Sequence, residues 1–257
     1  MDVAIVEFES YATSVAGALD VLDVGDEFST RSGVLIKPNL INDAPHPVTT
    51  PAACCEAIIN YIQARCDVPL VIAEGCGDSV LETDEVFAAL GYAALARKYD
   101  GVALLDLNRA PLTTRERPEC PVFPEMILPE IAFTHYIVSV PVLKAHSLAG
   151  LTGSLKNILG FAPPEHYSGR HGSWKKAVFH GRMQQSVIDL NRYITPDLTV
   201  MDASVGLADY HLGGRQCDPP VAKIIAGRNP WAVDREAAER LQLDWQSIAH
   251  VRDGLQE

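Results

Sequence analysis

The chain has 257 residues, 47% of them hydrophobic, which is enough to bury a sizeable core without disulfide bonds or structural metals. Its 33 acidic residues outnumber its 21 lysines and arginines, and the formal charge of −12 disfavours general binding to nucleic acid or anionic lipid. No stretch reaches the roughly 18 apolar residues that a membrane span needs, and the first ten residues lack the cationic start of a secretion signal. We therefore expect a cytoplasmic protein with neither nucleic-acid nor membrane partners.

The six cysteines show no C-x-x-C spacing, and Cys54 and Cys55 are adjacent. This pattern is neither a disulfide framework nor a zinc or iron–sulfur motif. We expect most of these thiols to be reduced and buried in the core.

Short apolar runs alternate with amphipathic segments, which is typical of an α/β fold with a mostly parallel sheet and flanking helices. In the first half, Thr50-Pro51 supplies a cap and a proline at the first helical position. The predicted elements are strands at 34–36, 70–73 and 101–107, a helix over 51–65 and another from Thr83.

The second half is predicted to contain strands at 136–140, 198–201 and 221–227, and to be helical from Pro230 onward. The proline-rich stretch 111–129 is expected to form an excursion or an edge hairpin. A long loop is predicted over 162–181, and a loop of that length usually serves a function, such as covering a site.

We expect a single α/β domain over residues 1–257. Two closely packed sub-lobes, at about 1–110 and 130–257, are the alternative.

Polar residues follow several predicted strands at their carboxyl ends. In open α/β sheets, ligands bind in the crevice beyond these ends, so such residues are the first candidates for a site. They are Lys37-Pro38-Asn39, Glu74-Gly75, Lys144-Ala145-His146 and Asp202.

Positive charge is concentrated between Lys144 and Arg182: this segment contains six lysines and arginines but only one acidic residue, Glu165. A cationic region on an anionic protein attracts small anions while the rest of the surface repels polyanions. We therefore expect a carboxylate, a phosphate or an anionic cofactor as the ligand. The alternative is a solvated loop whose charges have no ligand. The same segment holds four of the eight histidines: His146, His166, His171 and His180.

From these residues we predict an enzyme in which Lys144, His146 and Lys156 are catalytic, by proton transfer or redox chemistry. His146 would be a general acid/base or a metal ligand. The residues expected to bind the anion are Lys37, Asn39, Gly75 and Asn157. A divalent metal such as zinc, nickel or iron(II) would be held by His146, His180, Glu74 and Asp202, with His171 as an alternative to His180.

A second hypothesis is a non-catalytic module that binds a metal or a redox partner through Cys54, Cys55 and the histidine-rich loop. A third is a structural protein whose basic loop contacts an acidic partner. An enzyme would enclose Lys144, His146 and Lys156 in a pocket, whereas a binding module would expose them on a loop. The chain contains no Walker, G-x-G-x-x-G or G-x-S-x-G motif, which disfavours the common nucleotide-binding and hydrolase functions.

Taken together, these motifs resemble family 362 of domains of unknown function (DUF362), over about residues 33–245. The resemblance rests on K-P-N after the first strand, a glycine-containing loop after the second, K-x-H, T-x-S-L-K-N-x-x-G and later histidine and aspartate residues. Many members carry a ferredoxin-like module with cysteine clusters, which this chain lacks. The resemblance implies a ferredoxin-like redox partner and, with less support, an iron–sulfur cluster. The matching residues are Lys37-Pro38-Asn39, Glu74-Gly75, Lys144-Ala145-His146, Thr152 to Gly160, His180, Asp202 and Asp234.

The segment from His146 to Lys156 is also similar, more distantly, to the nickel-pincer lactate racemase group. In that group a histidine precedes a glycine- and serine-rich stretch and a lysine that holds a nucleotide-derived cofactor. The similarity implies a nickel-pincer-type nucleotide at Lys156. The residues after the lysine differ, and the nickel-binding histidine does not align uniquely to His171 or His180.

Overall fold

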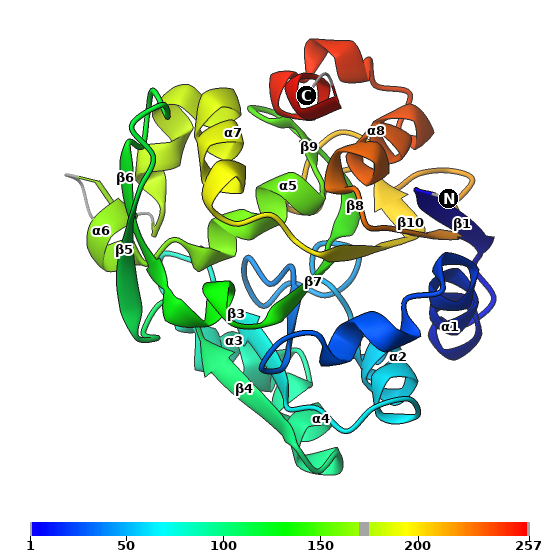
Figure 1. The fold of residues 1–257 in the computed structure, drawn as a ribbon. Helices are drawn as coiled ribbons and strands as arrows, with labels where there is room; N and C mark the ends of the chain where they lie inside the picture. Colours follow the sequence, from blue (N-terminus) through cyan, green and yellow to red (C-terminus); the bar gives the residue numbers. More distant parts are fainter. Residues whose placement is uncertain (1, 170–174, 256–257) are drawn as a thin grey trace.

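Nine strands form one mixed sheet in the computed structural model, which describes residues 2–169 and 175–255 (Figure 1). Two further strands, β5 (Leu112–Glu116) and β6 (Glu125–Pro129), pair separately as an antiparallel hairpin. The strands of the main sheet are β1 (Val3–Glu7), β2 (Val34–Pro38), β3 (Leu70–Glu74), β4 (Val102–Asp106), β7 (Tyr136–Val140), β8 (Val142–His146), β9 (Gly150–Thr152), β10 (Leu198–Leu207) and β11 (Lys223–Gly227).

The main path of the sheet runs β1-β11-β10-β7-β2-β3-β4. The five strands from β10 to β4 are parallel, whereas β11 is antiparallel to both of its neighbours. β8 pairs with the far part of β10, and β9 pairs with β8. Strands from both halves of the chain thus share one sheet, since β2 lies directly beside β7.

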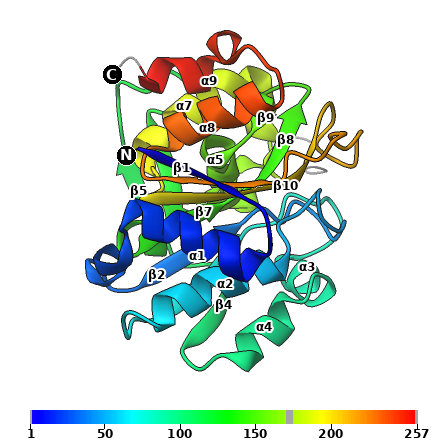
Figure 2. The ribbon, with the colours of Figure 1, turned by 90° about the vertical axis from the view of Figure 1, so that its right-hand side faces the viewer.

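Helices cover both faces of the sheet (Figure 2). The α-helices are α1 (Tyr11–Leu22), α2 (Ala52–Gln63), α3 (Thr83–Ala89), α4 (Tyr92–Lys98), α5 (Ser154–Asn157), α6 (Pro164–Tyr167), α7 (Met183–Tyr193), α8 (Pro230–Arg240) and α9 (Ala249–Arg252). The 3₁₀ turns are η1 (Gly25–Ser29), η2 (Glu130–Phe133), η3 (Ile158–Phe161), η4 (Ala177–Arg182), η5 (Trp245–Ser247) and η6 (Asp253–Leu255).

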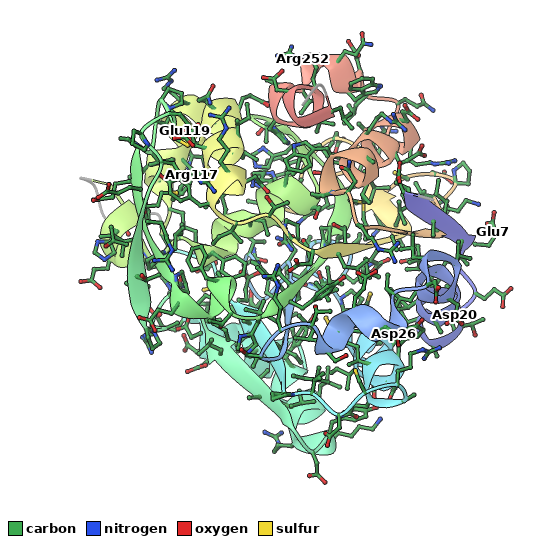
Figure 3. All side chains as sticks on the ribbon, viewed as in Figure 1. Glu7, Asp20, Asp26, Arg117, Glu119 and Arg252 are labelled. Atoms are coloured by element: carbon green, nitrogen blue, oxygen red, sulfur yellow. The ribbon has the colours of Figure 1, made fainter. Side chains whose placement is uncertain are left out.

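The central strands are apolar on both faces because each face packs against helices. In β2, Val34 and Ile36 belong to one hydrophobic core and Leu35 to the other, as the two-residue period of a strand requires. The first core includes α1 and α2, and the second includes α5, α7 and α8. The acidic side chains Glu7 and Asp20 lie at the periphery of the molecule (Figure 3).

The predicted α/β class with a mostly parallel sheet is confirmed, and the proline-rich stretch 111–129 does contain a hairpin. Two boundaries differ from the prediction. Pro141 separates β7 from β8, so Lys144 and His146 lie within a strand instead of after one. β10 continues beyond Asp202 to Leu207. Its first part pairs with β7 and its later part with β8, and the Pro141 carbonyl between these two strands accepts a hydrogen bond from Asp202 N.

Other parts of the chain also differ in detail. β1 was not predicted as a strand, and it pairs with β11 at one end of the sheet. The predicted loop over 162–181 contains α6 and most of η4. All six cysteines are free, and four of them, including Cys54 and Cys55, are buried, as expected. None of the described helices is both long and apolar enough to cross a membrane.

The short helix α5 is fixed by a carboxylate from α8. Asp234 is fully buried, and it accepts hydrogen bonds from the backbone N–H groups of Ser154 (2.6 Å) and Leu155 (3.0 Å) at the start of α5. A Cβ atom at Gly153 would lie 2.2 Å from the Asp234 carboxylate, so only glycine fits there. The hydrogen bonds from Ser154 and Leu155 to Asp234 fix the start of α5 and therefore also the position of Lys156, which follows Leu155.

We expect Asp234→Ala to lower the free energy of unfolding by about 1–3 kcal/mol for each of the two amide donors left without an acceptor. Urea denaturation measures this change. Glu239→Ala on the same helix is the control, because Glu239 is exposed and should change stability by less than about 0.5 kcal/mol. Equal stabilities of the two variants would contradict a structural role for Asp234.

Candidate functional site

A cavity of about 290 Å³ lies at the carboxyl ends of β2, β3 and β8. Its walls come from the loops after β2 (39–42) and β3 (75–79), from α5 and from residues 175–176. His146, His180 and His211 also line it. The position agrees with the general rule for open α/β sheets.

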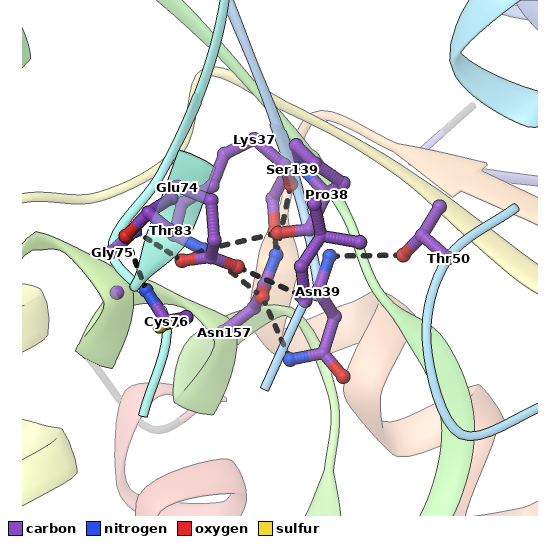
Figure 4. A network of polar contacts seen from close by, with 12 residues as sticks. Lys37, Pro38, Asn39, Thr50, Glu74, Gly75, Cys76, Thr83, Ser139 and Asn157 are labelled. Carbon is purple, nitrogen blue, oxygen red and sulfur yellow. Dashed lines mark hydrogen bonds and ion pairs between the residues drawn. The ribbon is translucent and has the colours of Figure 1, made fainter. Parts of the chain in front are cut away.

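A buried ion pair forms the framework behind this cavity (Figure 4). The Lys37 ammonium donates to Glu74 Oε1 at 2.7 Å, and neither side chain is more than 4% exposed. Burial lowers the pKa of Lys37, and the Glu74 carboxylate opposes that effect. The same carboxylate accepts hydrogen bonds from the backbone N–H groups of Leu40 (2.9 Å) and Gly75 (2.8 Å). Lys37 and Gly75, predicted to bind the anion, therefore already have a partner in Glu74.

Gly160 is required by the close packing around this ion pair. A Cβ atom at this position would lie 2.1 Å from Glu74 Oε1 and 2.5 Å from Lys37 Nζ. Any larger residue would displace one of the two charged groups. Close packing thus explains why the last position of the T-x-S-L-K-N-x-x-G stretch is a glycine.

Asn157 and Asn39 connect the ion pair to the cavity wall. Asn157 Oδ1 accepts from Lys37 Nζ and from Asn39 Nδ2, both at 3.3 Å, while its Nδ2 donates to Lys37 O and to Ser139 Oγ. Asn39 Oδ1 in turn accepts from Lys144 Nζ at 2.6 Å. Both asparagines line the cavity, but their amides also hold neighbouring segments together.

Lys144 is buried behind the wall and is not itself part of the lining. Besides Asn39, its ammonium donates to Val48 O at 2.6 Å. Burial and the nearby charge of Lys156 lower the pKa of Lys144 to about 7. Lys144 therefore positions Asn39 and does not itself contact the space in which a ligand would lie.

Lys175 and Lys176 line the cavity, although neither was a predicted site residue. Lys176 Nζ donates to three neutral oxygens, those of Asn108, Gly160 and Ala162, and burial lowers its pKa to about 7. Lys175 Nζ donates to Leu81 O at 2.6 Å. Their only signal in the sequence was membership of the cationic segment.

Lys156 differs from the other lysines of the site. Within residues 2–169 and 175–255, its ammonium makes no hydrogen bond or ion pair, and the half-buried side chain lines the cavity. Burial lowers the pKa of Lys156 to about 8. Glu74 does not compensate this charge through a direct contact, because its oxygens are bonded to Lys37, Leu40 and Gly75. An uncompensated cation therefore faces the cavity.

His146 lies in the cavity wall as a neutral ring. Its Nδ1 accepts hydrogen bonds from the backbone N–H groups of Leu148 and Ala149, both at 3.1 Å, so the proton of the neutral ring is on Nε2. Burial, together with the charge of Lys156, lowers the pKa of His146 to about 2. At neutral pH the ring is a hydrogen-bond donor through Nε2 and not an imidazolium acid.

His211 stacks on His146, with ring centroids 3.9 Å apart. Burial and the charge of Lys156 lower the pKa of His211 to about 3, and its buried Nδ1 has no hydrogen-bond partner among the described residues. His211 was missed in the sequence because it lies in an irregular loop. The nearby Gly213-Gly214 pair, typical of a turn or a close backbone approach, was the only indication.

Asp202, one of the four predicted metal ligands, is not in the cavity lining. It accepts from Tyr11 OH at 2.8 Å and pairs with His46 Nε2 at 3.1 Å. Burial raises its pKa, but the hydrogen bonds from His46 and Ser204 outweigh that effect and hold it below its usual value. Glu74, His146 and His180 do line the cavity, while His171 lies outside the described residues.

The described residues do not fit a metal centre. In the part of the chain that the structure describes, no three His, Cys, Asp or Glu side chains lie close enough together to hold a metal ion. Cys54 and Cys55 are fully buried in α2 and belong to a hydrophobic core. The nickel-pincer nucleotide, the iron–sulfur cluster and the ferredoxin-like partner stay predictions.

Glu74→Gln should destabilise the protein by about 3–5 kcal/mol, because it leaves the Lys37 ammonium buried without a counter-ion. Urea denaturation measures the loss. The double variant Lys37→Met/Glu74→Gln should recover much of it, since no unpaired charge remains. If the double variant were as unstable as Glu74→Gln, the loss would come from the backbone hydrogen bonds of Glu74 and not from the ion pair.

Comparison of the chain with curated proteins and with solved structures finds no match. The family model described as "Domain of unknown function (DUF362)" matches residues 34–239. The matched range contains Lys37, Glu74 and Lys156, and also Asp234, which anchors α5. The chain therefore belongs to the DUF362 family.

Proposed function

We propose that this protein is an enzyme that binds a small anionic substrate or cofactor against Lys156. The observation that carries the proposal is the uncompensated Lys156 ammonium in the wall of a cavity. A half-buried charge without a partner is partly desolvated, and an anion in the cavity would relieve that cost. The overall charge of −12 disfavours a large polyanion as the ligand.

The enclosure of the site supports an enzyme over a binding module. Lys156 and His146 line a cavity, and Lys144 lies buried behind it, instead of all three extending from an exposed loop. The soft ligands of the alternative hypothesis, Cys54 and Cys55, are buried away from solvent. Enclosed sites with a few convergent polar groups are typical of small-molecule binding.

The chemistry of these groups supports proton transfer. A lysine with a pKa of about 8 is present in both protonation states near neutral pH, which is the condition for efficient acid/base catalysis. The neutral His146 ring, with its proton on Nε2, can donate a hydrogen bond to a bound oxyanion. In this proposal Lys156 holds the anion and exchanges the proton, and His146 orients the bound group.

Lys156→Met should weaken binding of acetate and of methyl phosphate by about 10- to 100-fold, the loss expected for one charge-assisted hydrogen bond. Isothermal titration calorimetry measures both affinities. Lys98→Met is the control, because it removes the same charge from an exposed site on α4, where Lys98 pairs with Glu56. Unchanged affinity in Lys156→Met would refute the proposal.

Acetate affinity should fall as the pH rises through about 8, because only the ammonium form of Lys156 attracts the carboxylate. Lys144 on β8 and Lys176 lose their protons near pH 7, which adds to the decline on the same side. His146 and His211 stay neutral throughout this range. Calorimetry between pH 5 and 10 tests this profile, and Lys156→Met should lack the step near pH 8. Affinity that rose with pH would contradict the assignment.

A further inference from the structure

Most of the exposed apolar side chains of the described residues lie on segments that also contribute residues to the cavity lining. The described residues include seven large hydrophobic side chains that are exposed, and two of them, Ile5 and Val21, lie on β1 and α1. The other five come from four loops or turns that are far apart in sequence. They form what we name the apolar rim: Val80, Leu148, Val178, Tyr210 and Leu212.

Each member of the apolar rim is either a lining residue or within two positions of one. Leu212 lines the cavity itself, and Tyr210 and Val80 are next in sequence to the lining residues His211 and Ser79. Leu148 and Val178 are two positions from His146 and His180, respectively. Apolar patches around a polar pocket are typical of binding surfaces and are rare on surfaces that contact only water.

A second, shallow hollow lies next to the cavity. It has a volume of about 400 Å³, and Leu148 and Met183 line it together with the polar side chains of Arg182, Gln184 and Gln185. His180 lines both the hollow and the cavity, so the two adjoin each other at this residue. A ligand held at Lys156 would reach Leu148 and Met183 only by passing His180.

We propose that the ligand of this site is an amphipathic anion, with a carboxylate or phosphate head at Lys156 and an aliphatic or aromatic body on the apolar rim. This inference rests on the proposed function and specifies the substrate class. The combination of an uncompensated cation inside and apolar side chains outside matches a molecule with one charged and one apolar end. A second copy of this chain fits less well, because two copies each carry a charge of −12 and repel one another.

Two pairs of probes test this inference by calorimetry at pH 7: acetate against octanoate, and methyl phosphate against octyl phosphate. Each fully buried methylene strengthens binding about fourfold, so two such groups already give more than tenfold. We expect the long-chain member of at least one pair to bind at least tenfold more tightly than the short one. The pair that shows the larger gain identifies the head group.

Variants of the apolar rim separate this inference from the proposed function. Leu148→Ser and Val178→Ser should weaken binding of the long-chain probe by about 3- to 10-fold and leave the short one unchanged. Val21→Ser is the matched control, because Val21 is exposed on α1, away from the cavity. Lys156→Met should weaken both probes of the pair.

The outcomes are distinguishable. Equal binding of short and long probes, both lost in Lys156→Met, would overturn the amphipathic ligand and leave the proposed function intact. Binding that did not depend on Lys156 would refute both. A dimer that Leu148→Ser dissociates, with octanoate and octyl phosphate affinities unchanged, would show that a second copy covers the rim and would also overturn this inference.

Discussion

The ion pair between Lys37 and Glu74 is the interaction on which the geometry of this site depends. It joins the carboxyl ends of β2 and β3, and its carboxylate also fixes the backbone of the two loops that begin there. Glu74 is paired with Lys37, and among the described residues no ion pair joins it to Lys156. The Lys37–Glu74 pair is therefore neutral as a whole, and the charge of Lys156 has no direct counter-ion in the described residues.

The groups around the Lys156 ammonium do not neutralise its charge. His146 and His211 are held neutral, so they add no further positive charge at physiological pH, and the backbone amides bound to His146 fix which nitrogen carries its proton. Lys176 has only neutral oxygen acceptors among its hydrogen-bond partners. The cavity thus combines a positive potential with a wall of fixed hydrogen-bonding groups, which is the arrangement that binds and orients a small anion without reorganisation.

The sequence allowed most of the sheet and part of the cavity wall to be predicted, because these parts follow from local patterns. The apolar runs of β2 and β3 and the polar residues after them indicated where Asn39 and Glu74 would lie. The partnership of Lys37 with Glu74 could not be read in this way, since it joins residues 37 positions apart through the pairing of two strands. β8 was missed because the predicted strand ended at Val140, whereas the chain continues past Pro141 into a second strand that takes over from β7 as the neighbour of β10.

Asp202, a predicted metal ligand, lies outside the cavity lining. As an acid at the end of an apolar run it looked like a ligand, but tertiary structure places it beside His46 and Tyr11. His211 and the apolar rim come from irregular loops, and the meeting of such loops has no periodic signal in the sequence. The sequence alone therefore does not indicate which loops, far apart along the chain, lie side by side in the structure.

The anchoring of α5 by Asp234 has a consequence for synthesis of the chain. Asp234 follows Ser154 by 80 residues, so the carboxylate that fixes Lys156 leaves the ribosome long after Lys156 itself. Until α8 has emerged and packed, the start of α5 has no acceptor from Asp234 and the lysine has no fixed place in the cavity. Nascent chains therefore lack a fixed Lys156 even after β2, β3 and β7 have been made, and the cavity wall is completed only when α8 has been synthesised.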